Sequence, residues 1–129
     1  MRVFKTKWFV RFARKEDISD KKLIDAVREA ENGLNDGDLG GGLIKKRVSR
    51  TGKGKRGGYR IILVFRAGDR SVLVFGFPKN AKANLNAVEL DAYQKLAQIY
   101  LSFSVAGLTK ALGEGELEEV DYNGEKISE

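Results

Sequence analysis

The sequence predicts an α+β fold: a small antiparallel or mixed, twisted sheet with two N-terminal helices and a C-terminal helix packed on it. Apolar residues recur at helical spacing in three segments, residues 8–12, 23–34 and 90–101. Between them, from Leu43 to Phe77, alternating and continuous apolar runs are typical of strands. With 129 residues and 42% hydrophobic side chains, we expect one compact domain over residues 1–112.

The N-terminal part predicts one strand and two helices. Residues 2–6 have the pattern of a short edge strand, and Trp8, Phe9 and Phe12 then recur at helical spacing beside basic residues. Ser19 is a suitable N-cap for a second helix, and Asn32-Gly33 suits a left-handed C-cap. The apolar stripe of that helix consists of Leu23, Val27, Ala30 and Leu34.

The middle of the chain predicts a flexible connector followed by three antiparallel strands. Residues 35–42 are rich in turn formers, and from Leu43 the polar and apolar residues alternate. This alternation places Leu43, Lys45 and Arg47 on one face. The next two strands, residues 59–65 and 71–77, are joined by a five-residue connection of hairpin type.

The C-terminal part predicts two helices and a tail. Asn86 and Glu89 have the spacing of a capping box, and the apolar stripe of residues 90–101 is expected to pack across the sheet. Residues 104–112 are expected to form another short helix. Residues 113–129 carry seven acids and one Lys; we expect an acidic, flexible tail with a hairpin at Asn123-Gly124.

The charge is strongly uneven along the chain. The net charge is +6, but residues 1–80 hold 20 basic and 9 acidic side chains, whereas residues 81–129 hold 4 and 9. The densest stretch, residues 45–60, has eight Lys or Arg and no acid. A cationic segment anchored to a buried strand is suited to binding a phosphate backbone, so nucleic acid is the expected partner.

The composition also excludes several kinds of chemistry. There is no cysteine or histidine, which removes thiol and imidazole catalysis and the usual zinc sites. Residues 53–58 lack the spacing of a phosphate-binding P-loop, and Asp36 and Asp38 are interpreted as turn formers, so we expect no metal and no cofactor. No apolar run is long enough to cross a bilayer, and we expect a cytoplasmic protein.

Four cations are the candidate catalytic residues. Lys45 and Arg47 share a strand face that can converge with Arg60, and Lys79 ends the last strand. Such a group can stabilise charge on a phosphodiester attacked by the adjacent RNA 2′-hydroxyl. Crowded like charges also allow Lys45 to act as a general base. The alternative is a solvated basic face that binds phosphate without cutting it.

Three motifs, in order, resemble the HigB-like branch of the RelE/ParE toxins of bacterial toxin-antitoxin modules. They are G-L-I-K-K-R-V, G-K-G-K-R-G-G-Y-R-I-I-L-V-F and V-F-G-F-P-K-N, and the likeness runs from about Gly41 to Tyr100. The resemblance implies a small α+β toxin that enters the ribosomal A site and cleaves mRNA. The ParE branch instead poisons DNA gyrase, which induction of the SOS response would reveal.

The resemblance also carries over individual residues. The family's basic strand positions fall on Lys45 and Arg47, the arginine of its Tyr-Arg element on Arg60, and the lysine that ends the last strand on Lys79. Where the RelE pattern has an arginine and then a tyrosine, this chain has Asn80 and Asn86. Tyr59 and Tyr93 are the candidate substitutes for that tyrosine as acid or base.

The partners expected from the resemblance are the ribosome, mRNA and a cognate antitoxin, which for HigB-like toxins is a helix-turn-helix, HigA-like protein. The residues expected to bind nucleic acid are Arg50, Lys53, Lys55, Arg56, Tyr59 and Asn80. A non-catalytic RNA-binding module is the remaining alternative, and it would show steep salt dependence without cleavage.

Overall fold

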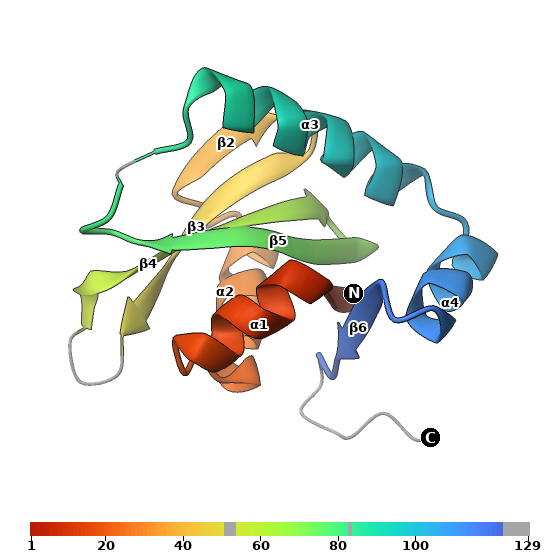
Figure 1. The fold of residues 1–129 in the computed structure, drawn as a ribbon, viewed down its shortest axis with the longest axis horizontal. Helices are drawn as coiled ribbons and strands as arrows, with labels where there is room; N and C mark the ends of the chain where they lie inside the picture. Colours follow the sequence, from red (N-terminus) through yellow and green to blue (C-terminus); the bar gives the residue numbers. More distant parts are fainter. Residues whose placement is uncertain (51–53, 83, 123–129) are drawn as a thin grey trace.

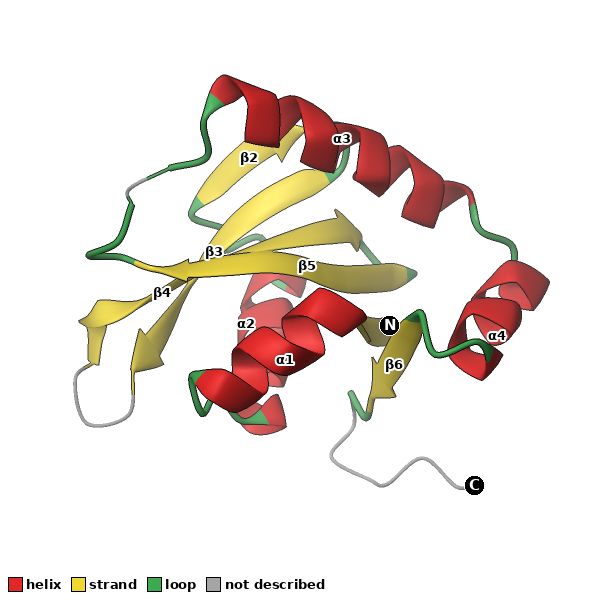
Figure 2. Cartoon of the chain, in the orientation of Figure 1, coloured by secondary structure: helices red, strands yellow, loops and turns green. Residues whose placement is uncertain are grey.

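The computed structural model describes residues 1–50, 54–82 and 84–122, and confirms the α+β class. Figure 1 shows the path of the chain, and Figure 2 shows its helices and strands. The elements in chain order are β1 (Arg2–Thr6), α1 (Lys7–Lys15), α2 (Asp20–Glu31), β2 (Gly37–Gly40), β3 (Leu43–Arg50), β4 (Gly54–Arg66), β5 (Arg70–Pro78), α3 (Ala87–Ser102), α4 (Val105–Gly113) and β6 (Leu117–Val120).

Within the described ranges, six strands form one mixed sheet in the order β2-β3-β4-β5-β1-β6. β3, β4 and β5 form the expected antiparallel meander. β1 was predicted as an edge strand, and this is wrong: it lies between β5, to which it is parallel, and β6, to which it is antiparallel. Those pairings join segments far apart in the chain, so the residue pattern of β1 alone does not predict them.

Two hydrophobic cores lie on opposite faces of the sheet because residues of β4 alternate between them. Ile61 and Leu63 face the core that includes α1 and α2, whereas Ile62 and Val64 face the core that includes α3 and α4. Figure 1 shows α3 passing across the sheet, as predicted. The expected N-caps are confirmed: the Ser19 side chain accepts from the Lys22 amide, and Asn86 and Glu89 form a complete capping box.

The segment between α2 and β3 differs from its prediction. Leu34 was placed in the stripe of α2, but the helix ends at Glu31, Gly33 takes a left-handed φ of +83°, and Leu34 is 61% exposed. The expected connector of residues 35–42 contains β2, which pairs with β3. The asparagine and glycines that predict turns hide this short strand, since their side chains add no apolar alternation.

The segment predicted as an acidic tail is folded in its first part. α4 includes Gly113, and Leu117–Val120 form β6 beside β1. Acids of β6 pair with cations of β1: Arg2 donates two hydrogen bonds of 2.8 Å to Glu119, and Lys5 Nζ lies 3.3 Å from a Glu118 carboxylate oxygen. The hairpin expected at Asn123-Gly124 lies outside the described residues.

Helices long and apolar enough to span a bilayer are absent from the part of the chain that the structure describes.

Candidate nucleic-acid site

The strand register brings two of the predicted cations together. Arg47 of β3 lies directly opposite Arg60 of β4, and Arg60 lies opposite Phe77 of β5. Lys45 is two residues before Arg47, on the same face, and its partner is Ile62. This face also carries the core that includes α3.

Arg60 is the most unusual of these cations because it is buried. The residue is 8% exposed, and its Nη1 atom has no hydrogen-bond partner among the described residues. Burial and then the charge of Arg47 lower the pKa of Arg60, while Asp36 opposes this shift. A guanidinium stays charged at neutral pH despite such a shift, so Arg60 holds a positive charge and an unused donor.

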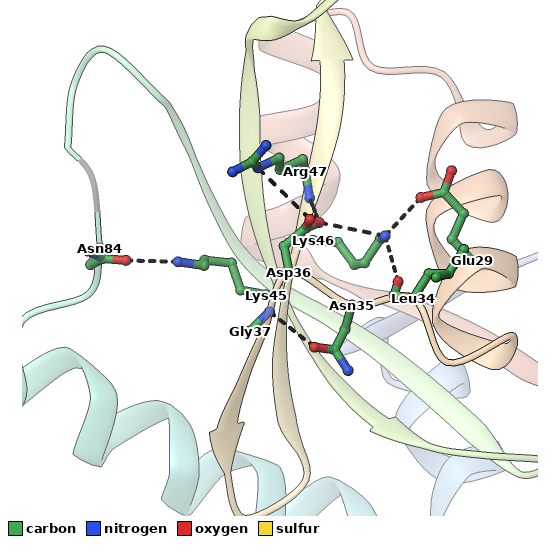
Figure 3. A network of polar contacts seen from close by, with 9 residues as sticks. All are labelled: Glu29, Leu34, Asn35, Asp36, Gly37, Lys45, Lys46, Arg47 and Asn84. Carbon is green, nitrogen blue, oxygen red and sulfur yellow. Dashed lines mark hydrogen bonds and ion pairs between the residues drawn. The ribbon is translucent and has the colours of Figure 1, made fainter.

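Asp36 contacts both the backbone and the side chain of Arg47 (Figure 3). Its Oδ2 atom accepts a 2.7 Å hydrogen bond from the Arg47 amide and lies 3.6 Å from Lys46 Nζ, and its Oδ1 atom lies 3.9 Å from Arg47 Nε. Partial burial acts to raise the pKa of Asp36, but the Arg47 amide and the charges of Lys46 and Arg47 outweigh it, so the pKa is lowered. The carboxylate therefore stays ionised and restrains Arg47.

Lys46 belongs to the opposite face of the sheet. Its side chain is 3% exposed and donates to Glu29 Oε1 at 2.8 Å and to the Leu34 carbonyl at 2.7 Å. Figure 3 shows Lys46 directed to α2, whereas Lys45 points to the segment before α3. Of the two neighbouring lysines, Lys46 is structural and Lys45 faces the candidate site.

Lys45 lies on the same sheet face as the Arg47–Arg60 pair, and Lys79 follows the end of β5. Lys45 Nζ donates a 2.8 Å hydrogen bond to Asn84 Oδ1. Lys79 is exposed and directly follows β5, and its amide donates to the Gly58 carbonyl at 3.1 Å. Asn80 is exposed beside it. The structure gives no contact between the Lys79 side chain and the Arg47–Arg60 pair.

Lys82 is a cation of this region that the sequence analysis missed. Its Nζ lies 5.7 Å from the ring centroid of Phe77, the cross-strand partner of Arg60, and 5.9 Å from that of Phe75. It also forms a 2.5 Å ion pair with Glu89. Hydrogen bonds from Lys82 and the Asn86 amide lower the pKa of Glu89. Lys82 lies in an irregular segment, where spacing predicts no direction for a side chain.

The two tyrosines considered as acid or base lie on different faces. Tyr59 is 2% exposed, packs in the core beneath α1 and α2, and donates its hydroxyl proton to Glu16 Oε1 at 3.0 Å. Tyr93 of α3 stacks on Phe75 with ring centroids 5.1 Å apart. Burial and then the charge of Glu89 raise the pKa of Tyr93. Only Tyr93 lies on the face of Arg47 and Arg60.

Four of the residues predicted to bind nucleic acid are not described. Lys53 lies outside the described residues, and so do the side chains of Arg50, Lys55 and Arg56. Among the described residues, no three acidic side chains form a group that could hold a metal ion.

The arrangement can hold an anion of at least two oxygens. Arg47 and Arg60 are register partners, so their side chains are neighbours on one face. Guanidinium groups donate in a planar fork that matches phosphate. Asp36 pairs with Arg47 at 3.9 Å, but no carboxylate of the described residues forms an ion pair with Arg60. A bound phosphate would therefore offset the like charges of the two arginines and engage Arg60 Nη1.

The comparisons with known proteins identify the family. The family model described as the RelE toxin of the RelE/RelB toxin-antitoxin system matches residues 1–120. A search of curated protein sequences found no match to the chain.

Proposed function

Because the chain belongs to the RelE toxin family, we propose that it is a ribosome-dependent mRNA endonuclease that stops translation. The family match makes it a toxin of a toxin-antitoxin system and implies an antitoxin partner. The ribosome, the message and the HigB-like branch are the parts that we propose. For that branch the antitoxin is a helix-turn-helix protein of the HigA type.

The observation that carries this proposal is the Arg47–Arg60 pair, in which the Arg60 Nη1 atom has no hydrogen-bond partner among the described residues. Buried polar groups are nearly always hydrogen-bonded, and a catalytic role or a bound ion is among the explanations for an exception. A phosphate oxygen fits both the charge and the missing acceptor. We therefore assign the scissile phosphate to this pair.

The chemistry proposed for the site is cleavage by the RNA's own hydroxyl. The 2′-oxygen forms a bond to phosphorus as the bond from phosphorus to the 5′-oxygen breaks, and the proton lost by the 2′-hydroxyl is balanced by one taken up at the 5′-oxygen. Negative charge grows on the phosphoryl oxygens in the transition state. Arg47 and Arg60 stabilise that charge because they are held in place before the reaction.

The other cations would bind the polymer on either side. Lys45, held by Asn84, and Lys79, at the end of β5, would contact adjacent phosphates. Lys53, Lys55 and Arg56 would contact the ribosomal or messenger RNA backbone. Each such contact releases counterions and contributes affinity without reading sequence.

The test is primer extension on a defined mRNA in a reconstituted translation reaction, with and without ribosomes. Arg60→Ala is compared with Arg66→Ala, which removes an exposed arginine at the other end of the same strand. We expect new 5′ ends only with ribosomes, their loss in Arg60→Ala and their retention in Arg66→Ala. An intact message with the wild-type chain, or full cleavage by Arg60→Ala, would contradict the proposal.

A further inference from the structure

A row of aromatic rings crosses from α1 over β5 to α3. Trp8 stacks on Phe12 with centroids 5.1 Å apart and an interplanar angle of 14°, and it lies 4.8 Å from Phe75. Phe75 in turn stacks on Tyr93 at 5.1 Å. Figure 1 shows β5 between α1 and α3, which places the three elements of this row in sequence. Trp8, 38% exposed, is the accessible end of the row.

The row exists because β5 extends beyond its parallel neighbour. β1 pairs only with residues 70–73 of β5, so α1 covers the following part of that strand. Gly76 permits the close approach: a Cβ atom there would lie 2.5 Å from Phe12 Cε2. Phe12 therefore rests on the strand backbone, and Trp8 contacts the rings of Phe12 and Phe75 while part of its surface stays exposed.

An open groove of about 440 Å³ adjoins Trp8, and we call it the Trp8 groove. Its apolar wall includes Phe12, Phe75 and Pro78, and its rim carries Arg11 and Lys15. This volume is within the usual range for ligand sites.

The rim of the Trp8 groove has a surplus of positive charge. Arg11 and Lys15 are exposed, and neither forms an ion pair with a carboxylate among the described residues. The same holds for Lys7 and Arg14 of α1, and this helix has no acid of its own. Glu16, which accepts from the Tyr59 hydroxyl, is the acidic member of the lining. Unpaired cations beside an exposed ring are complementary to an anion with a flat apolar part.

The Trp8 groove adjoins the candidate phosphate site through Phe77, which is one of its lining residues. Phe77 lies opposite Arg60, and Phe75 lies two residues earlier on the same strand. The Phe75 and Phe77 ring centroids are 5.9 Å apart. A strand of RNA whose phosphate is held at Arg60 can therefore continue along β5 to Trp8.

We propose that the Trp8 groove binds an unpaired nucleobase of single-stranded RNA, stacked on Trp8, with Arg11 and Lys15 on the flanking phosphates. An aromatic platform edged by cations is the arrangement that proteins use for single strands. Every base has an aromatic face, so this site adds affinity and direction to the RNA path without codon preference. The inference rests on the proposed function for the choice of RNA as the polymer.

Trp8 is the only tryptophan of the chain, so tryptophan fluorescence reports whether the Trp8 groove is occupied. The experiment titrates the full-length protein with hexaadenylate RNA at low salt and follows tryptophan emission. We expect saturable quenching. Emission that does not change on RNA binding overturns the proposal, and so does equal quenching by polyglutamate, which would indicate an acidic protein partner instead.

Variants separate stacking from charge by the anisotropy of labelled hexaadenylate. Trp8→Leu should weaken binding by about tenfold, and Trp8→Phe by less, because stacking on an aromatic ring contributes about 1–3 kcal/mol per base. The double change Arg11→Gln with Lys15→Gln should reduce the salt slope by about 1.4. Lys110 is an exposed cation of α4, and Lys110→Gln should leave the salt slope unchanged. Equal affinities of Trp8→Leu and the wild type would overturn the stacking site.

The outcomes also separate this inference from the proposed function. Cleavage on the ribosome without quenching of Trp8 overturns the Trp8 groove alone. Quenching by RNA without cleavage on the ribosome supports the groove and contradicts the endonuclease.

Discussion

Replacement of Arg60 by methionine is expected to stabilise the fold while it removes the proposed activity. Arg60 is buried, its Nη1 atom has no partner among the described residues, and Arg47 is its neighbour. A buried polar group without a partner costs about 1–3 kcal/mol, and the like charge of Arg47 adds to this cost. Methionine has a similar length and can pack against Phe77, the residue opposite.

The free energy of unfolding of Arg60→Met should therefore exceed that of the wild type by about 1–3 kcal/mol. Urea denaturation followed by circular dichroism measures it, provided that the slope with denaturant is unchanged. Arg66→Met is the matched control: this exposed arginine pairs with Asp69, and we expect a loss below about 1 kcal/mol. If Arg60→Met is instead less stable than the wild type, then Arg60 stabilises the free protein. That result would refute the argument that Arg60 destabilises the free protein and finds its partner in a bound phosphate.

Three further predictions concern residues that support the two sites. Lys46→Ala should lower the free energy of unfolding in urea by about 1–3 kcal/mol, because it leaves the Leu34 carbonyl without its donor. Gly76→Ala should cost about 1–3 kcal/mol through its clash with Phe12 and shift the emission of the nearby tryptophan; unchanged stability and emission would contradict the packing described. The pKa of Asp36 is lowered in the folded protein. Its contribution to stability is therefore fully present above the unfolded-state pKa and is lost as pH falls through the lower folded-state pKa. Asp36→Asn should accordingly flatten the acid side of the plot of unfolding free energy against pH.

The parts of the fold that depend on neighbouring residues were predictable. Ser19 and Asn86 cap helices because their side-chain oxygens reach amides three residues later, and that spacing is visible in the chain. The alternation from Leu43 to Arg47 likewise gave the face of each side chain in β3. It follows that the Arg47–Arg60 pairing was predictable once the two strands were taken as neighbours.

The parts that depend on distant segments were not predictable in the same way. The position of β1 inside the sheet depends on pairing with β5 and β6, which no local pattern encodes. The glycines of β2 add no apolar alternation, so the sequence shows no strand pattern there. Lys82 and Asn84 reach the candidate site from an irregular segment, and the aromatic row depends on three elements meeting at β5. Each of these features needs the three-dimensional arrangement of the chain.

The central claim is that the RNA's own 2′-hydroxyl cleaves a phosphodiester held by Arg47 and Arg60 on the ribosome. The measurement that tests it most directly is the single-turnover rate of mRNA cleavage on the ribosome, with ribose or 2′-deoxyribose on the 5′ side of the cut. We predict that the deoxy substitution abolishes cleavage while the affinity of the chain for the RNA is retained. Cleavage of the deoxy message at the rate of the ribose message would contradict the account.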